Sequence, residues 1–201
     1  MSELHISDAA LMGQLKQDDT RALASLIDRW EGRLLHFIYR YVQNESIARD
    51  LVQETFVRVY QARNRFDVKR NFSTWMFGIA ANLCRNHYRW LSRHAEAELE
   101  SAPEPVDNKT PVEQIDTQEK SSRIADHVRA LPHALRVALL LYYYEDLSYE
   151  EIAAVVGCSI RGVESRLYRA RKTLAARMDC EQEAAGSDLS KARQTPSKLM
   201  I

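Results

Sequence analysis

Apolar residues recur every three or four positions along most of this chain, which is the spacing of one buried face on an α-helix. Residues 21–41, 47–60 and 73–90 each carry such a stripe, and a shorter helical segment fits residues 8–16. Asn44 separates the first long stripe from the second, and a polar connector around Phe66 precedes the third. We therefore predict an N-terminal bundle of three long helices with a short extra helix in front of it.

The pattern stops between residue 92 and about residue 111, where prolines and acids accumulate as in a linker. It resumes over residues 112–130, and Pro132 suits the first turn of a further helix. Only 6 Gly and 5 Pro are present, which favours helices over an all-β fold. We predict an all-α protein of two small helical domains, residues 8–93 and 118–178, with an acidic linker at 94–117 and a polar, disordered tail at 179–201.

Residues 147–177 carry the signals of a helix-turn-helix. Ser148 and Glu151 have the spacing of a capping box, in which each side chain satisfies the other residue's backbone N–H. Gly157 follows at the end of that helix and can adopt the left-handed conformation of a C-terminal cap without steric cost. Ser159 can cap the second helix, whose apolar positions repeat every three or four residues up to Leu174.

The polar side of this second helix, which we call the recognition face, is mostly cationic. Its side chains are Arg161, Glu164, Ser165, Tyr168, Arg169 and Lys172. Such a helix fits the major groove of DNA, where arginine pairs with guanine edges or phosphates and glutamate can accept from a cytosine amino group. The alternative is a solvated basic face on an ordinary helical hairpin.

Charge is balanced in total but segregated along the chain. Lys plus Arg and Asp plus Glu both number 28, so the formal net charge is zero. Residues 159–178 hold six basic residues and one acid, whereas residues 95–120 hold eight acids and two lysines. Segregation of this kind indicates separate partners. The neutral total predicts that the free protein binds duplex DNA weakly, because little long-range attraction remains.

Other function classes find little support. No apolar run approaches the roughly 18 residues of a membrane span, so we expect no membrane insertion and a cytoplasmic protein. Cys84, Cys158 and Cys180 are odd in number and lack a CxxC spacing, which indicates neither a disulfide framework nor a zinc site. The histidines form no HExxH pair, and the sequence matches neither a nucleophile triad nor a phosphate-binding glycine loop. We expect no enzyme activity, cofactor or metal.

Two groups of motifs give the chain a resemblance to a known family. They are DLVQETF at 50–56, FSTWMF at 72–77 and IAAN at 79–82, then LP at 131–132, LSYEEIA at 147–153, SRL at 165–167 and RAR at 169–171. In this order and spacing, over about residues 8–178, the chain resembles the extracytoplasmic-function (group 4) sigma factors of the sigma-70 family. The resemblance implies that it binds core RNA polymerase and directs it to promoters, with the two domains acting as sigma regions 2 and 4.

The resemblance also implies roles for polar residues of the N-terminal half. Asp50, Gln53 and Glu54, which we call the docking patch, would dock on the clamp helices of the polymerase beta-prime subunit; the pattern alone gives only a solvated helix face. The downstream promoter element would be recognised and melted by the downstream set, Arg65, Asn82, Arg85, Asn86 and Arg89. Within it, the connector at 65–72 with Asn82 and Asn86 would capture a flipped base of the non-template strand. Trp75 would be a melting wedge or, as its helical position favours, a core residue.

By the same resemblance the recognition face would bind the upstream promoter element, the acidic linker would thread the polymerase cleft, and an anti-sigma factor would cover the docking and DNA surfaces. One departure stands out. The family opens the recognition helix with a Gly-Thr pair before Val and a basic residue, whereas Arg161 and Gly162 occupy the pair here and Glu164 stands where a cation is common. The promoter sequence therefore cannot be copied from relatives.

Two functions of other classes are the alternatives. A stand-alone helix-turn-helix regulator would use its N-terminal half to sense or dimerise, and it would have no need of the motifs at 50–56 and 72–86. A protein that only sequesters a partner would keep its DNA affinity after charge reversal at Arg169 and Lys172.

Overall fold

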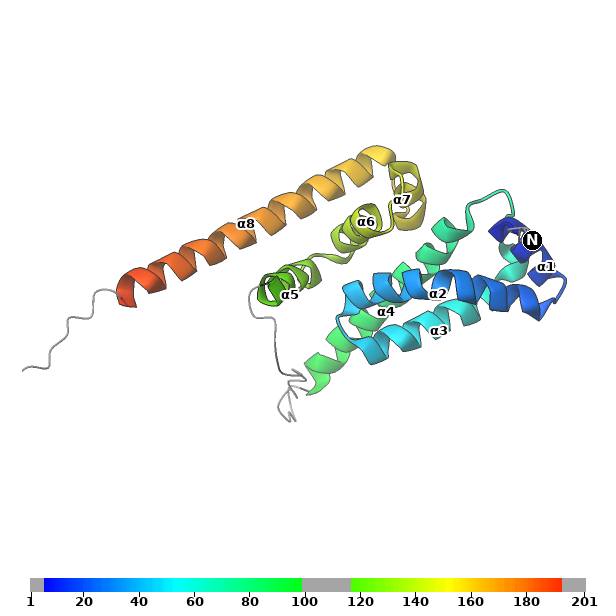
Figure 1. Cartoon of the computed structure of the whole chain (residues 1–201), viewed down its shortest axis with the longest axis horizontal. Helices are drawn as coiled ribbons and strands as arrows, with labels where there is room; N and C mark the ends of the chain where they lie inside the picture. The colour runs from blue at the N-terminus through cyan, green and yellow to red at the C-terminus, as the bar shows by residue number, and fades with distance from the viewer. Residues whose placement is uncertain (1–5, 99–116, 193–201) are drawn as a thin grey trace, which may run out of the picture.

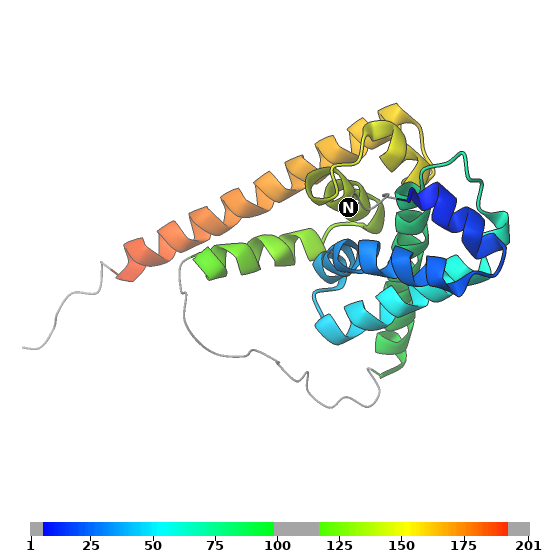
Figure 2. The ribbon, with the colours of Figure 1, turned by 45° about the vertical axis from the view of Figure 1, so that its right-hand side comes forward.

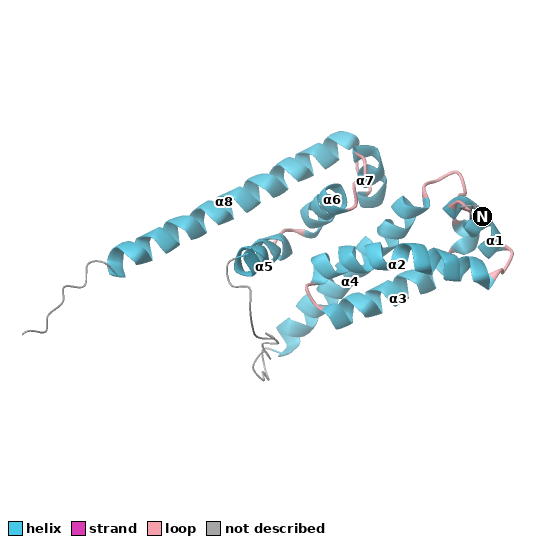
Figure 3. Cartoon of the chain, in the orientation of Figure 1, coloured by secondary structure: helices cyan, strands magenta, loops and turns pink. Residues whose placement is uncertain are grey.

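The computed structural model describes residues 6–98 and 117–192, and all regular structure within these ranges is helical (Figures 1 and 3). An N-terminal group contains α1 (Asp8–Lys16), α2 (Thr20–Val42), α3 (Glu45–Gln61), the short 3₁₀ helix η1 (Arg63–Arg65) and α4 (Phe72–Glu98). A C-terminal group contains α5 (Thr117–Arg129), α6 (His133–Tyr144), α7 (Tyr149–Val156) and α8 (Ile160–Ala192). The predicted all-α class with two helical groups is confirmed.

Aromatic side chains dominate the core between α2, α3 and α4. Phe37 and Phe77 are fully buried, and their rings meet nearly edge to face with centroids 5.2 Å apart. Trp30 packs against Phe72 and Phe77 at 6.2 and 6.3 Å. Burial of each such ring contributes roughly 1.5–3 kcal/mol, and a favourable ring pair adds about 0.5–1.5 kcal/mol. This core fixes α4 against the two helices before it.

The C-terminal group has an aliphatic core centred on α6. Residues 135–141 of α6 are buried on every side, because the helix lies between α2 on one side and α7 and α8 on the other (Figure 2). Ile152 from α7 and Val163 and Leu167 from α8 complete this core. A helix that is apolar on nearly every side, as α6 is apart from the buried Arg136, needs such enclosure.

The local signals of the helix-turn-helix are confirmed. The Ser148 hydroxyl accepts from the backbone N–H of Glu151 at 3.2 Å, and the Glu151 carboxylate accepts from the N–H of Ser148 at 2.9 Å. Gly157 ends α7 in the left-handed region with φ 65°. The Ser159 hydroxyl accepts from the N–H of Gly162 at 3.1 Å, as a cap of α8. The turn therefore takes the geometry that its residue types dictate.

Two helices run longer than their sequence patterns predict. α4 continues to Glu98, beyond the expected boundary at residue 93, and α8 continues to Ala192, where a disordered tail was expected from residue 179. The segments RHAEAE at 93–98 and DCEQEAA at 179–185 contain mostly good helix formers and no proline, and the single Gly186 costs only about 1 kcal/mol. The rest of the expected tail and most of the expected linker, including residues 112–116 of the expected next helix, lie outside the described residues.

Candidate nucleic-acid interface

α8 presents the recognition face on its outer side. Val163, Leu167 and Ala170 turn inward and are at most 1% exposed, so the residues between them point away from the core. All six predicted side chains are exposed, and Tyr168 reaches 64%. The structure therefore brings the whole predicted set together on one free helix surface, which is what insertion into a groove requires.

Three arginines of α8 lie outside this face, namely Arg166, Arg171 and Arg177, and Arg177 donates to two backbone carbonyls at and just after the end of α5. The Arg171 side chain donates to the Tyr143 hydroxyl at 2.9 Å and lies near the rings of Tyr142 and Tyr143. Arg166 is half-buried and has one guanidinium nitrogen out of contact with solvent. The six basic residues between positions 159 and 178 are thus divided equally: three lie on the recognition face and three contact other parts of the protein or are partly covered by it.

The unusual Gly162 has a local structural cause. A Cβ atom at this position would lie 3.1 Å from Cys158 Sγ and 3.2 Å from Cys158 Cβ, which is tighter than most real contacts. Cys158 sits in the turn before α8, and its thiol fills the space that a larger side chain at position 162 would need. The glycine at position 162 is therefore coupled to the cysteine at position 158 by packing in the turn.

The downstream set divides into a helical part and a loop part. Asn82, Arg85, Asn86 and Arg89 are all exposed on α4 at spacings of three and four, so they share one helix surface. An Arg85 nitrogen donates to Asn82 Oδ1 at 2.8 Å, which orients both side chains. Arg65 is exposed at the end of η1, on a different element. The structure thus brings together four of the five predicted residues.

The connector between η1 and α4 is anchored by aromatic packing. Phe66 is only 2% exposed, and its ring lies 4.8 Å from Trp75 and 6.0 Å from Phe72. Trp75 is half-buried and packs against the core, as its helical position favoured. On either side of Phe66 the polar residues of the connector face solvent, so the loop has one buried anchor and an exposed rim.

A cleft of about 690 Å³ separates the start of α4 from α7. Arg70, Asn71, Trp75 and Asn82 contribute to one wall, and Glu150 and Glu151 to the other. The Asn71 amide donates to Glu151 Oε1 at 2.7 Å, so the capping box of α7 also holds the connector. Arg70 and Asn71 belong to this polar surface, although the pattern of the sequence singled out only the connector as a whole.

Two further sets of contacts join the N-terminal and C-terminal helical groups, and the first set involves Arg33 and Arg40 of α2. The buried Glu145 accepts from the Arg33 side chain at 3.2 Å, and the Glu145 carbonyl accepts from the same guanidinium at 3.0 Å. Burial raises the pKa of Glu145, and the charge of Arg33 works against that rise. The guanidinium of Arg40 lies 4.1 Å from the Tyr144 ring centroid. These residues of α2 hold the segment that follows α6.

The second set of contacts joins the end of α2 to the start of α6. The Tyr41 hydroxyl lies 2.8 Å from His133 Nδ1, and Arg136 donates to the Tyr41 carbonyl at 3.1 Å. Burial, together with the charges of nearby arginines, lowers the pKa of His133 to about 4. A cavity of about 350 Å³ opens beside it, lined by Tyr41, Arg85, Tyr88, Arg89, Arg93 and His133. The neutral imidazole is therefore the form that this arrangement favours.

The docking patch lies on α3. Asp50 and Gln53 are exposed, whereas Glu54 is half-buried and accepts from the Arg58 side chain at 2.7 Å. Val57, one turn after Gln53, is an apolar side chain that stays 47% exposed. The sequence pattern missed Val57, because an exposed valine on an amphipathic helix is visible only once the buried stripe is known.

Comparison with known proteins gives matches to both halves. A family model of Sigma-70 region 2 matches residues 26–94, and one of Sigma-70, region 4 matches residues 122–174. The ECF RNA polymerase sigma-E factor of Haemophilus influenzae is 32% identical, over 84% of this chain and 94% of its own. The RNA polymerase sigma-H factor of Pseudomonas aeruginosa is 31% identical, over 83% and 91%.

Solved structures agree with this fold. CnrH in complex with the cytosolic domain of CnrY has a TM-score of 0.66 and 28% identity, covering 86% of this chain and 97% of that one. The sigma factor RpoE in complex with the anti-sigma factor NepR from Bartonella quintana has a TM-score of 0.62 at 24% identity, covering 78% and 96%, and this likeness concerns the fold alone.

Two further properties concern the described residues only. Among helices of residues 6–98 and 117–192, none combines the length and apolar character that crossing a membrane demands. Within the same ranges, His, Cys, Asp and Glu side chains form no group of three that could hold a metal ion.

Proposed function

Because this chain belongs to the sigma-70 family, as a sigma factor of the extracytoplasmic-function class that directs transcription initiation, we propose a division of labour between its two helical groups. The N-terminal group docks on core RNA polymerase and opens the downstream promoter element. The C-terminal group binds the upstream element through the recognition face. The observation that carries the proposal is this exposed, mostly cationic face on a correctly capped helix-turn-helix.

The docking patch supports the first role. Asp50 and Gln53 are exposed on α3 next to the exposed Val57, so a partner helix meets both polar and apolar groups there. Protein interfaces use this combination, in which an apolar contact is surrounded by polar groups that fix orientation. We assign the patch to the clamp helices of the polymerase beta-prime subunit.

The downstream set supports the other role of the N-terminal group, the opening of the downstream promoter element. Its four α4 residues supply amide and guanidinium groups, and no acid lies between Asn82 and Arg93. Extruding a base costs a few kcal/mol, which hydrogen bonds and stacking in a pocket can offset. The cleft beside Asn71, Trp75 and Asn82 has the amide groups and the aromatic ring that such a pocket needs.

The domain boundaries, an inhibitory partner and the cellular compartment are proposed on the same basis. Residues 8–93 act as region 2 and residues 118–178 as region 4, joined by the acidic segment 94–117, in line with the matches at 26–94 and 122–174. CnrH and RpoE are described in complexes with the cytosolic domain of CnrY and with the anti-sigma factor NepR. We propose an inhibitory partner of this kind for the present chain, and a cytoplasmic site of action.

Run-off transcription with purified core polymerase tests the function directly. Holoenzyme assembled with this chain is expected to yield discrete transcripts from a randomised promoter library, whereas core polymerase alone yields none. Absence of any promoter-dependent transcript would refute the sigma assignment and favour the stand-alone regulator.

A charge reversal on α3 tests the docking role. The double variant Asp50→Arg, Gln53→Arg should weaken binding to core polymerase by about tenfold or more, because two long cations replace the acid and the amide that fix orientation at the interface. Binding of the upstream element to the C-terminal group should not change. Glu31→Arg, an exposed acid on α2, is the matched control. Equal losses from both variants would contradict the assignment of the patch.

A further inference from the structure

The first helix of the chain lies outside the family match and yet contacts the connector that precedes α4. The Sigma-70 region 2 match begins at residue 26, whereas α1 ends at Lys16. Leu11, Met12 and Leu15 of α1 are nearly or fully buried against the N-terminal core, so the helix is firmly seated. Both α2 and η1 contact it. Its position relative to the connector is therefore fixed by packing.

The C-terminal end of α1 holds the first half of the connector. The Lys16 ammonium donates to the backbone carbonyl of Phe66 at 2.6 Å, across fifty positions of sequence. The next residues carry Asp18, whose carboxylate pairs with the side chain of Arg63 in η1 at 2.5 Å. Arg63 is largely covered, and its guanidinium also donates to the Tyr60 carbonyl. Charge-assisted bonds of this kind are stronger than neutral ones, particularly where one partner is half-buried.

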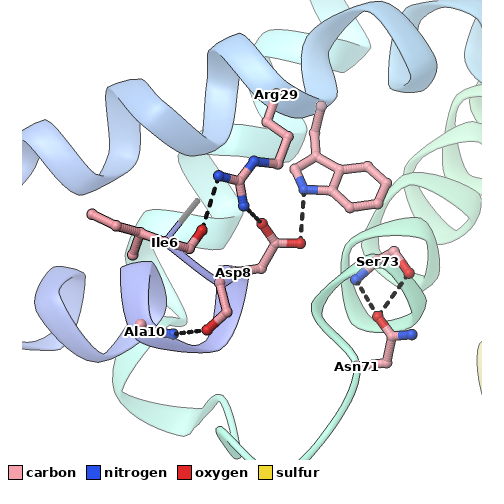
Figure 4. A network of polar contacts seen from close by, with 8 residues as sticks. Ile6, Asp8, Ala10, Arg29, Asn71 and Ser73 are labelled. Carbon is pink, nitrogen blue, oxygen red and sulfur yellow. Dashed lines mark hydrogen bonds and ion pairs between the residues drawn. The ribbon is translucent and has the colours of Figure 1, made fainter. Parts of the chain in front are cut away.

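The N-terminal end of α1 supports the second half of the connector through Trp30. Asp8 accepts from the side chain of Arg29 and, at 3.1 Å, from the indole N–H of Trp30 (Figure 4). The Trp30 ring packs on Phe72, the first residue of α4. Beside it, the Oδ1 of Asn71, the residue before α4, accepts from the N–H and the hydroxyl of Ser73 in the first turn of α4 (Figure 4). α1 therefore reaches both ends of the connector.

We propose that α1 is a positioning element for the connector, with Lys16 and Asp18 as its positioning residues. The connector has one buried anchor, Phe66, and the Lys16 bond fixes the carbonyl of that same residue. Fixing it sets the direction in which the exposed rim from Asp67 to Asn71 meets a DNA strand. The inference rests on the proposed function, because it assigns Lys16 and Asp18 to capture of the separated strand.

The test separates positioning from general affinity. Holoenzyme first selects its preferred downstream sequence from a randomised promoter library. The probe is a short single-stranded oligonucleotide with that sequence, compared with the same oligonucleotide carrying one replaced base. Lys16→Met keeps most of the length of the unbranched side chain and removes its donor. It should lower the ratio of matched to mismatched affinity by on the order of tenfold, which is about the discrimination that one good base contact supplies.

Lys69→Met is the matched control, because Lys69 is an exposed lysine within the connector itself. It removes one charge near the strand, so it should weaken matched and mismatched probes alike and leave their ratio unchanged. Lys16→Arg keeps a donor and should restore most of the ratio. Binding to core polymerase and to upstream duplex should stay at the level of the unmodified protein in all three variants.

Three outcomes overturn the inference. They are an unchanged ratio in Lys16→Met, an equal loss of ratio in Lys69→Met, and a loss of ratio accompanied by an equal loss of core binding. If Lys16→Met unfolds at a markedly lower temperature, Asp18→Asn decides, because the Asp18 side chain is 69% exposed and its loss leaves the core intact. Failure of the unmodified protein to select any downstream sequence would instead count against the proposed function.

Discussion

The two surfaces assigned to DNA differ in what stands opposite them. Within residues 6–98 and 117–192 nothing covers the recognition face of α8, whereas the N-terminal part of the α4 surface and its connector share a cleft with α7. Both surfaces carry exposed polar side chains, and the second is bonded to α7 through Asn71 and Glu151. One surface is ready for a rigid duplex, and the other must release an internal contact before a strand can enter.

Charge reversal on the recognition face is expected to have the largest effect. Arg169→Glu with Lys172→Glu should lower the affinity for an upstream-element duplex by about 100-fold at low salt, because two phosphate-seeking cations become repulsive. The slope of log affinity against log salt should flatten by about 2. Fluorescence anisotropy with labelled duplex measures both quantities.

Arg21→Glu is the control for this variant, since its side chain is 91% exposed on α2, in the other helical group. It should change duplex affinity by less than about twofold. Unchanged affinity in the double variant would instead support a protein that only sequesters a partner, and it would remove the contrast between the two surfaces.

The difference between the surfaces also explains what the sequence could reveal. The recognition face and the capping box depend on residues three or four positions apart, and this spacing is visible in the chain. The bonds between the helical groups join residues far apart: 80 positions for Asn71 and Glu151, 92 for Tyr41 and His133, and 112 for Arg33 and Glu145. No periodicity relates such pairs. The sequence therefore could not predict the cleft, although it predicted the helices and the connector that form its walls.

Helix propensity, which the interpretation of the polar tail left out, accounts for the extra length of α8. The tail after Met178 is polar, which suggested disorder, but its residues up to Ala185 are mostly good helix formers and they continue α8. Gly162 could be identified as unusual from its sequence alone. Its cause could not, because the thiol of Cys158 occupies the space above it only after the turn has formed.

Removal of the bond between Arg33 and Glu145 should open the cleft. Arg33→Ala leaves the buried Glu145 carboxylate without its guanidinium partner, a loss of roughly 1–3 kcal/mol that separation of the groups can relieve by hydration. Energy transfer between dyes on α3 and α8 should decrease. Binding of single-stranded downstream DNA to the free protein should rise several-fold. Affinity for upstream duplex should stay the same, because the recognition face is already open.

Arg49→Ala is the matched control for Arg33→Ala. Arg49 pairs with Glu45 on the exposed side of α3, within one helix. Its loss should leave the energy transfer unchanged, as surface pairs contribute about 0–1 kcal/mol. A gain in single-strand binding from both arginine variants would show that simple charge removal, and not opening of the cleft, is responsible.

Lowering the pH should also weaken the contact between the two helical groups, but by less than Arg33→Ala does. The pKa of His133 is lowered from 6.5 to about 4 while the two helical groups are in contact, which we call the closed state. The state in which the groups have separated therefore binds a proton at His133 more readily. The closed state is therefore fully favoured above about pH 6.5 and loses stability as the pH falls towards 4. The charges that face His133 are those of Arg85, Arg89, Arg93, Arg136 and Arg166. Energy transfer between α3 and α8 should fall over this range.

His133→Gln tests the assignment of that pH dependence. The variant keeps a polar side chain near the Tyr41 hydroxyl and cannot gain a proton, so the decrease in energy transfer should disappear. Glu145 acts in the opposite direction, because burial raises its pKa and its proton favours the closed state at low pH. A pH profile that is identical in the variant would show that His133 does not control the interface.

The smallest expected effect concerns the start of the recognition face. Gly162→Ala improves helix propensity by about 1 kcal/mol, but its new Cβ meets Cys158 Sγ at 3.1 Å, so the single variant should be close to neutral in unfolding free energy. Cys158→Ala in addition removes the contact to Sγ and keeps the contact to Cβ at 3.2 Å, so part of the propensity gain of about 1 kcal/mol should become visible. A double-mutant cycle by thermal unfolding measures the coupling between the two positions.

Because neither side chain belongs to the recognition face, upstream duplex affinity should vary by less than about twofold across the cycle. Additive effects would mean that the Cys158 thiol does not determine the choice of glycine, and a large change in affinity would mean that the turn sets the position of the face on DNA.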